Sequence, residues 1–225
     1  MSSALVVGGR RGLGREVAEQ LEQAGWSVLR TGRSRADLES ADGRARDYEP
    51  LDLRDDSSVA RLAHAQASRG RTLDLLVISA GSASLGGMTE LEPTTFLTML
   101  DEHVVGTYRL VRQFRPQLAA ARGHVIVVLS RMGSRPRPHG YGYGTAKAAT
   151  GFLTQCLAME LEPDGIRLNY VSPGAMDTDM FRTAFPGRDP ATALDVGDVA
   201  RTIVALTTPE FHHLSGAVIE LPRPR

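Results

Sequence analysis

Two residues that could move a proton together stand four positions apart, in the segment Tyr143-Gly-Thr-Ala-Lys147. Residues at i and i+4 of a helix lie on one face. A free tyrosine has a pKa of about 10, too high for acid–base catalysis near neutral pH, and a neighbouring ammonium should lower it. Lys147 is the only lysine among the 26 lysine and arginine residues of the chain. The pair is suited to protonating an alkoxide.

A third polar residue, Ser130, lies thirteen positions before Tyr143, at the end of an apolar run that predicts a strand. In open α/β sheets, ligands bind at the carboxyl ends of the strands. A serine hydroxyl there can donate to a carbonyl oxygen and hold it near the tyrosine. Tyr141 is of the same type, but its i+4 residue is Thr145. Ser130, Tyr143 and Lys147 therefore predict proton transfer that accompanies reduction of a carbonyl by hydride.

The elements that must position these residues are short apolar runs alternating with longer amphipathic segments. Such alternation predicts one doubly wound α/β domain covering residues 1–225. A proline lacks the N–H of a helix interior, so Pro116 should kink or end the helix that starts at Pro93. The expected strands are residues 5–7, 26–31, 48–51, 73–79, 124–130, 166–171 and 217–221, and the other expected helices are 12–24, 57–68, 143–162 and 199–207.

A glycine-rich turn, Gly8-Gly-Arg-Arg-Gly12-Leu-Gly14, follows the first expected strand and opens the first expected helix. Glycine lets the backbone approach a pyrophosphate, and the helix end offers free N–H groups and a positive dipole. The glycines follow the order G-x-x-x-G-x-G rather than G-x-G-x-x-G. The turn predicts dinucleotide binding by Gly8, Arg10, Arg11, Gly12, Leu13 and Gly14.

The second expected strand runs into Thr31-Gly32-Arg33-Ser34, where NAD-binding folds place an acid for the ribose 2′-hydroxyl. Arg33 stands there instead, and Arg11 lies in the glycine turn. Guanidinium groups can hold a 2′-phosphate bidentately, and each charged hydrogen bond contributes roughly 1.5–3 kcal/mol. These residues favour NADP(H) over NAD(H), and therefore reduction; both arginines could also be solvated surface residues.

Taken together, the glycine turn, Ser130, Tyr143 and Lys147 resemble the short-chain dehydrogenase/reductase family, although Val7 stands where that family usually has threonine. The resemblance runs from residue 4 to about residue 221. It implies a Rossmann-like parallel sheet of about seven strands with helices on both faces, and a homodimer or homotetramer packed through two long helices. It also implies further cofactor contacts at Asp52 and Leu53 near the adenine, at Ser79, Ala80 and Gly81 after the fourth strand, and at Pro173, Gly174, Met176 and Thr178 near the nicotinamide.

The chain departs from that family at two places. The Asn-x-x-Gly segment of the long helix reads His103-Val-Val-Gly106. The family's asparagine supports a helix kink and a water near the lysine; His103 could do the same, relay protons, or have no chemical role. The C-terminus ends Leu221-Pro-Arg-Pro-Arg225, without the family's glycines, so tetramer contacts through that tail are not expected.

Two segments are expected to border the substrate. Residues 179–192 should form a lid lined by Met180, Phe181 and Phe185, and residues 131–141 should form the other wall. The second segment carries Arg135, Arg137 and His139, which could bind an anionic or polar group of the substrate or lie in a solvated loop.

Composition narrows the function classes. The 26 basic and 26 acidic residues give no net charge, hence no field to attract nucleic acid or an anionic membrane. One cysteine, Cys156, cannot form an internal disulfide, and no apolar stretch approaches the ~20 residues of a membrane helix. His212-His213 lacks partners at metal-ligand spacing, so no metal site is expected. With a strand starting near Ala4, a signal peptide has no room, and a cytoplasmic protein is expected.

The sequence thus favours an NADPH-dependent reductase of a small ketone or aldehyde. An NAD(H)-linked alcohol dehydrogenase or an imine or enone reductase could use the same three residues. A catalytically silent NADP-binding module is less favoured, because it has no need of Ser130, Tyr143 and Lys147 at this spacing. A sugar-nucleotide epimerase or dehydratase would need a further C-terminal domain, for which no chain remains after residue 221.

Overall fold

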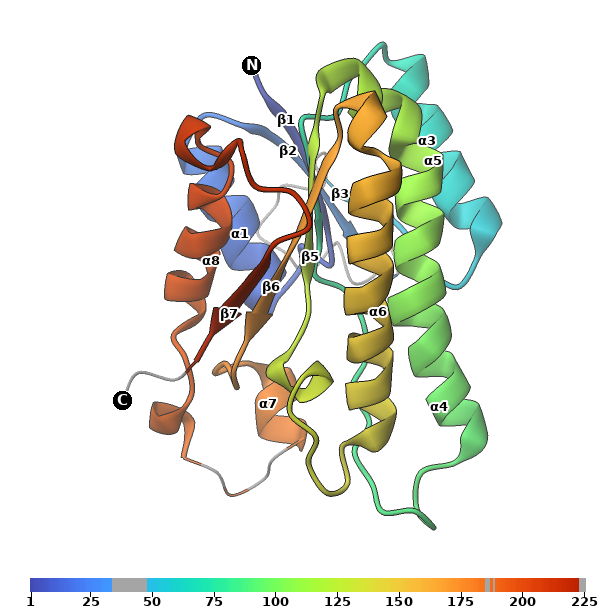
Figure 1. Ribbon diagram of the computed structural model, residues 1–225, viewed down its shortest axis with the longest axis vertical. Coiled ribbons are helices and arrows are strands. Elements are labelled where there is room, and N and C mark those ends of the chain that lie inside the picture. Colours follow the sequence, from blue (N-terminus) through green and yellow to red (C-terminus); the bar gives the residue numbers. More distant parts are fainter. Residues whose placement is uncertain (34–47, 185–186, 188, 223–225) are drawn as a thin grey trace.

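The computed structural model describes residues 1–33, 48–184, 187 and 189–222. Seven strands form one sheet in the order β3-β2-β1-β4-β5-β6-β7, and every neighbouring pair is parallel. Their carboxyl ends point toward the lower end of the molecule (Figure 1). The strands are β1 (Ser3–Val7), β2 (Ser27–Gly32), β3 (Tyr48–Pro50), β4 (Leu75–Ile78), β5 (His124–Val128), β6 (Arg167–Pro173) and β7 (Val218–Leu221).

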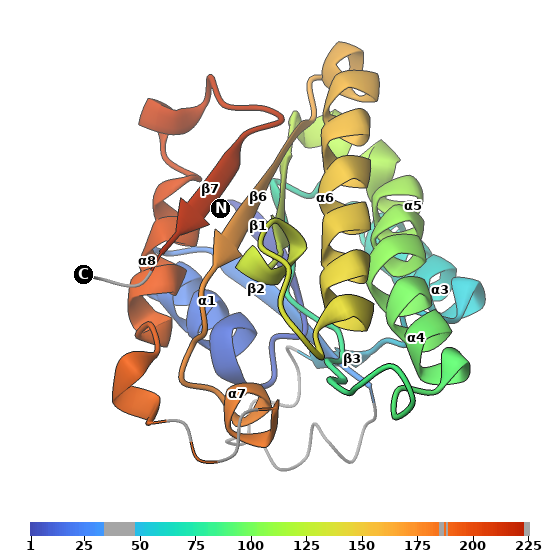
Figure 2. The same cartoon turned by 60° about the horizontal axis from the view of Figure 1, so that its bottom comes forward.

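Helices cover both faces of the sheet, as Figures 1 and 2 show. One face packs against α1 (Gly12–Gln23) and α8 (Val196–Ala205), and the other against α3 (Asp56–Ser68), α5 (Gly106–Ala121) and α6 (Tyr141–Glu160). Alternate residues of β1 enter the two cores, Leu5 and Val7 one and Ala4 and Val6 the other. Period-two alternation with both faces covered explains why the strands are apolar throughout. The predicted doubly wound, seven-stranded fold is confirmed.

Two further α-helices of the described residues lie toward the carboxyl end of the sheet. These are α4 (Pro93–Leu100), which leads into α5, and α7 (Asp179–Ala184), which lies beneath β6 in Figure 1. Among the described residues, none of the helices combines the length and the hydropathy needed to span a bilayer.

The long helix after Pro93 is interrupted at the segment of His103, where the family resemblance implies a kink, and not at Pro116. Pro116 was expected to kink or end the helix; helix α5 continues through Pro116 to Ala121, so an end at that residue is excluded. Pro116 cannot bond the carbonyl of Arg112, but both residues are exposed, so water can satisfy that carbonyl. The interruption is a π-helical turn at Asp101–Val105, between α4 and α5, and His103 lies in it.

Candidate active site

Ser130 follows β5 and begins a short 3₁₀ turn at Arg131–Gly133. Its hydroxyl oxygen accepts a hydrogen bond from the Met132 backbone N–H at 3.2 Å. The turn lies directly on α6, since a Cβ added to Gly133 would stand 2.9 Å from the backbone nitrogen of Ala148. Close packing of the turn on the helix places Ser130 beside the first turns of α6, where Tyr143 and Lys147 stand.

Tyr143 and Lys147 occupy one face of α6, which begins at Tyr141, two residues earlier than predicted. The Lys147 side chain is buried, with 6% of the residue exposed, and its Nζ donates a hydrogen bond to the Val128 carbonyl oxygen at 2.9 Å. The same nitrogen lies 5.6 Å from the centroid of the Tyr143 ring. Lys147 therefore ties α6 to the end of β5 and brings a cationic group beside the phenol.

Burial changes the acidity of both groups in directions that the sequence did not indicate. It raises the pKa of Tyr143 to about 12, although a hydrogen bond with the Ser130 side chain acts in the lowering direction. It lowers the pKa of Lys147 to about 7. The expectation of a lowered pKa for Tyr143 is wrong, because the cost of removing the phenolate from water outweighs the hydrogen bond with Ser130. Tyr143 is therefore a protonated phenol at neutral pH.

His103 meets Tyr143 edge to face, with ring centroids 5.6 Å apart. Burial first, and then the charge of Lys147, lower the pKa of His103 to about 3. The ring is therefore neutral at pH 7. Its Nε2 lies 2.7 Å from the Ser82 carbonyl oxygen, which can only accept, so Nε2 carries the hydrogen. His103 thus links the interrupted helix to the segment after β4.

Gly81 makes room for that histidine. Its φ is +145°, and an added Cβ would overlap the His103 ring. The next residue, Ser82, donates from its N–H and its hydroxyl to the Glu102 carboxylate at 2.9 and 2.5 Å. Neither Ser82 nor Glu102 was predicted from the sequence. No local pattern marks them, because the contact joins residues 20 positions apart.

Three segments expected to hold a cofactor converge at the carboxyl end of β1. A Cβ added to Gly8 would lie 2.8 Å from the Ala80 backbone nitrogen, and one added to Gly12 would lie 3.5 Å from the Thr178 methyl carbon. The glycine turn therefore touches the segments after β4 and β6. This backbone-lined cradle, at the start of a helix of twelve residues, fits a pyrophosphate.

Four other residues expected to hold a cofactor are Leu13, Leu53, Gly174 and Met176, and they contact the protein in different ways. Leu13 and Leu53 bury their side chains, so only their main chains could reach a dinucleotide. The Gly174 N–H donates to the Leu221 carbonyl, which holds the Pro173-Gly174 turn against β7. Met176 pairs with Leu194 in an isolated bridge.

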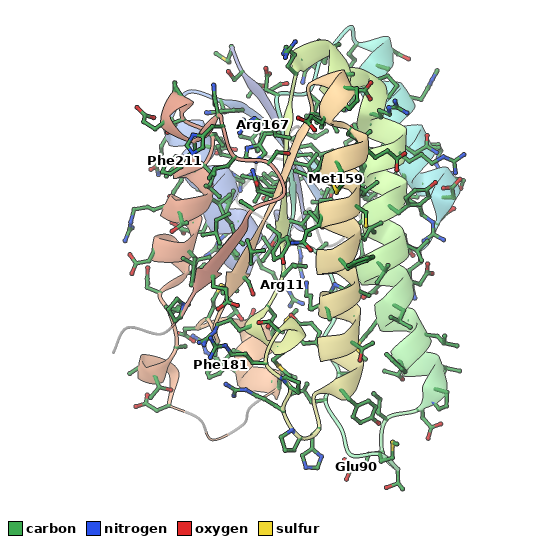
Figure 3. The ribbon with its side chains drawn as sticks, in the orientation of Figure 1. Arg11, Glu90, Met159, Arg167, Phe181 and Phe211 are labelled. Atoms are coloured by element: carbon green, nitrogen blue, oxygen red, sulfur yellow. The ribbon has the colours of Figure 1, made fainter. Side chains whose placement is uncertain are left out.

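At the expected adenosine end, Asp52 is hydrogen-bonded by Arg54, whose Nε and Nη2 lie 3.2 and 3.1 Å from its two carboxylate oxygens. This contact, with Arg33 contributing last, lowers the pKa of Asp52. Arg33 and Arg11 are exposed, and Arg11, labelled in Figure 3, precedes α1. Arg54 was not anticipated. If Asp52 accepts a hydrogen bond from an adenine amine, its carboxylate oxygens must also accept the hydrogen bonds from Arg54.

The two expected substrate walls differ in how much of them is exposed. Phe181, labelled in Figure 3, is buried in α7, whereas Met180 is 40% exposed. Phe185 lies outside the described residues. In the other wall, Arg137 and His139 are exposed, and His139 has a positive φ of 61°. The His139 carbonyl accepts a hydrogen bond from the Gly86 N–H at 3.0 Å, so the loops after β4 and β5 meet at this edge.

Comparisons with known proteins agree with this geometry. A family model described as short chain dehydrogenase matches residues 2–189. An uncharacterized oxidoreductase of Staphylococcus epidermidis is 28% identical over 221 residues, which cover 96% of this chain and 95% of the relative. An alcohol dehydrogenase from the archaeon Thermococcus sibiricus, solved with 5-hydroxy-NADP, is 26% identical with a TM-score of 0.86, covering 99% of this chain and 96% of that one. A 3-ketoacyl-(acyl-carrier-protein) reductase from Brucella melitensis, solved with NADH, shares the fold at 24% identity and a TM-score of 0.86. The match covers 98% of this chain and 96% of that one.

Proposed function

The chain belongs to the short-chain dehydrogenase family of oxidoreductases, and we propose that it is an NADP(H)-dependent member that reduces a small ketone or aldehyde to an alcohol. The observation that carries the proposal is the grouping of Ser130, Tyr143 and Lys147 next to the glycine-rich cradle. A silent dinucleotide-binding module would not need a buried lysine, which is costly to fold. The proposed enzyme is a single cytoplasmic domain, residues 1–225.

Each of the three residues has a distinct part in the proposed reaction. A bound reduced nicotinamide supplies the hydride that the carbonyl carbon accepts. The Ser130 hydroxyl donates a hydrogen bond to the carbonyl oxygen and orients it. Tyr143 gives its phenolic proton to that oxygen as negative charge develops there. Lys147, when charged, stabilises the phenolate left behind.

The acidity of Tyr143 favours reduction over alcohol oxidation at neutral pH. Reduction needs the protonated phenol, and burial, which raises the pKa of Tyr143, keeps it in that form at pH 7. Oxidation needs phenolate as a base, and that form is scarce at pH 7. We therefore prefer the reductase to the NAD(H)-linked alcohol dehydrogenase.

NADP(H) is proposed because Arg11 and Arg33, both exposed, flank the expected 2′-position, and no acid of the strand β2 stands there. The test is a titration of the purified protein with NADPH and with NADH, followed by assays of ketones and aldehydes. Tighter binding of NADPH and reduction of a ketone or an aldehyde support the proposal. Tighter binding of NADH would reverse the cofactor assignment and favour alcohol oxidation.

Replacing Arg33 with aspartate should weaken NADPH binding roughly ten- to a hundredfold, because one charged hydrogen bond to the 2′-phosphate is lost and a like charge is added. NADH binding should change little or improve. Fluorescence titration of both cofactors measures the two effects. Arg71→Asp, at an exposed position before β4 and therefore at the amino end of the sheet, is the matched charge reversal and should leave both affinities unchanged. Equal losses for NADPH and NADH in Arg33→Asp would refute the 2′-phosphate site.

His103 is proposed as a positioning residue rather than a proton donor. Its ring is neutral at pH 7, packs on the edge of Tyr143, and fixes the segment after β4 through Ser82. In that position it holds the Tyr143 ring against movement and keeps Gly81 close to the π-helical turn.

The outer face of α5 and α6 is proposed as a homodimer interface. Tyr108 is 43% exposed, Phe152 71% and Met159 77%, although all three are large apolar side chains. The helices lie side by side on one flank of the molecule (Figures 1 and 2), and Met159 is labelled on α6 in Figure 3. Cores of obligate interfaces are apolar and rich in aromatic residues and methionine.

The double variant Phe152→Glu and Met159→Glu should therefore be monomeric. Sedimentation velocity of wild type and variant at the same concentration measures the change. Met88→Glu places the same charge at a methionine that is 85% exposed in the loop after β4, and it should leave the dimer intact. A wild-type protein that is itself monomeric, or a double variant that remains dimeric, would exclude this interface.

A further inference from the structure

We propose that Arg131 binds an anionic group of the substrate, so that the enzyme prefers carbonyl compounds carrying a carboxylate close to the reacting carbonyl. This inference rests on the proposed reductase function and adds a substrate class to it. Arg131 is the residue directly after Ser130, so its backbone is fixed wherever Ser130 is fixed. The residues of this segment that the sequence predicts to bind an anionic or polar group are Arg135, Arg137 and His139, and not Arg131.

Hydrogen bonds of the 3₁₀ turn fix the main chain of Arg131. Its carbonyl oxygen accepts hydrogen bonds from the backbone N–H groups of Ser134 at 3.2 Å and Arg135 at 2.8 Å. The turn is pressed onto α6 through Gly133. A side chain that starts from so rigid a point is well placed to determine specificity, because little ordering entropy is lost when a ligand binds.

The side chain of Arg131 has a buried hydrogen-bond donor, Nε, without an acceptor. Its Nε is buried, and within the described residues no acceptor bonds it and no carboxylate lies within ion-pair distance of the side chain. A buried polar group without a partner costs about 1–3 kcal/mol, and more when charged. Such a group in a native structure calls for an explanation. An anion from a ligand would supply the missing acceptor.

The other arginines of the segment do not share this environment. Arg135 forms an ion pair with Glu220 of β7 at 3.6 Å, and Ser134 donates to the same carboxylate at 3.2 Å. Arg137 is exposed, so water can satisfy it. Arg131 is thus the arginine of this segment that directly follows Ser130 in sequence and has a buried, unsatisfied Nε.

The anion could in principle come from the substrate or from the phosphates of the cofactor, and the sheet order favours the substrate. The pyrophosphate cradle follows β1, whereas Arg131 follows β5, and β4 lies between these strands. With its carbonyl oxygen at Ser130, a 2-oxo acid carries its carboxylate one bond from the reacting carbon. A guanidinium can hold such a carboxylate bidentately.

The test compares two substrates with the same reacting ketone, the anionic phenylglyoxylate and its neutral methyl ester, with NADPH as reductant. Wild type should show a kcat/KM roughly ten- to a hundredfold higher for the acid, the value of one charged hydrogen bond. Arg131→Gln should lose that preference while its kcat/KM for the ester stays near wild type. Arg137→Gln is the matched control and should keep the preference. A wild type without preference for the acid, or an Arg131→Gln variant that keeps it, would overturn the inference.

Two binding measurements separate this inference from its alternatives. The Kd of NADPH should be the same in wild type and Arg131→Gln; a large loss in the variant would assign Arg131 to the cofactor and overturn the proposal. If neither phenylglyoxylate nor its ester is reduced, binding of mandelate and of methyl mandelate to the NADPH-loaded protein is measured by cofactor fluorescence. Mandelate binding that depends on Arg131 supports the anion site even where the reductase function fails. Equal or absent binding of the two compounds would overturn it.

Discussion

Replacement of Tyr143 with phenylalanine should lower kcat for carbonyl reduction by roughly 10²–10⁴-fold, the usual contribution of a positioned acid. The Kd of NADPH should stay close to that of the wild type. The reason is that the variant loses a single oxygen. The ring can keep its edge-to-face contact with His103, whose centroid is 5.6 Å away, and α6 keeps its position through the Lys147 hydrogen bond to Val128.

The control for this prediction is Tyr141→Phe, two positions earlier on the same helix. The Tyr141 hydroxyl donates to the Gly87 carbonyl at 3.2 Å, so its removal also costs one hydrogen bond. It lacks a lysine at i+4, and we expect turnover within a few-fold of wild type. Single-turnover kinetics with saturating NADPH compare the two variants directly. A Tyr143→Phe enzyme as active as Tyr141→Phe would rule out Tyr143 as the proton donor.

Residues close in sequence were the most predictable part of this site. The helix period alone places Tyr143 and Lys147 on one face, and the order of strand, glycine turn and helix places Gly8 to Gly14 at a helix start. The alternation of short apolar runs with longer amphipathic segments predicted the sheet, because an apolar strand must be covered by helices on both faces. These features depend on local geometry, which the sequence carries directly.

Features that depend on packing between distant segments were not predictable in the same way. Nothing near Gly81 in the sequence shows that its missing Cβ is the space occupied by His103, 22 positions away. Helix propensity alone pointed to a kink or an end at Pro116, because it identifies a proline but not a π-helical turn; only the family resemblance indicated a kink at the segment of His103, where the turn Asp101–Val105 lies. The pKa of Tyr143 was expected to fall, because the neighbouring lysine is visible in the sequence and the burial of the phenol is not.

The burial of Lys147 makes it costly for stability as well as useful for catalysis. Burial lowers its folded pKa to about 7 from an ordinary 10.5. Below pH 7 the lysine is charged in both states, and the folded protein carries the full cost of the buried charge. Between about pH 7 and 10.5 Lys147 is neutral in the folded protein but still protonated in the unfolded chain. The free energy of unfolding therefore rises with pH over this range, and above it the cost of the buried charge is gone. At about 1.4 kcal/mol per pKa unit, the cost at low pH is on the order of 5 kcal/mol.

Replacing Lys147 with methionine should therefore abolish most of the turnover and yet stabilise the fold at pH 6. The variant loses the ammonium that stabilises the phenolate, so kcat should fall by at least the roughly 10²-fold typical of a lost acid–base component. It also loses the hydrogen bond from Nζ to the Val128 carbonyl, which offsets about 1–3 kcal/mol of the gain in stability. A net increase of a few kcal/mol in the free energy of unfolding is expected.

The sign of the stability change should reverse with pH, and this reversal distinguishes a buried charge from a general packing effect. Above about pH 10.5 wild-type Lys147 is neutral in both states, so only the lost hydrogen bond remains and the methionine variant should be the less stable protein. Urea unfolding at pH 6, 8 and 10.5 measures the change. Thr145→Met, an exposed substitution on the same helix, should give a difference that does not vary with pH. A methionine variant destabilised equally at all three pH values would show that Lys147 is not held at a depressed pKa, and the account of a lysine that trades stability for catalysis would fail with it.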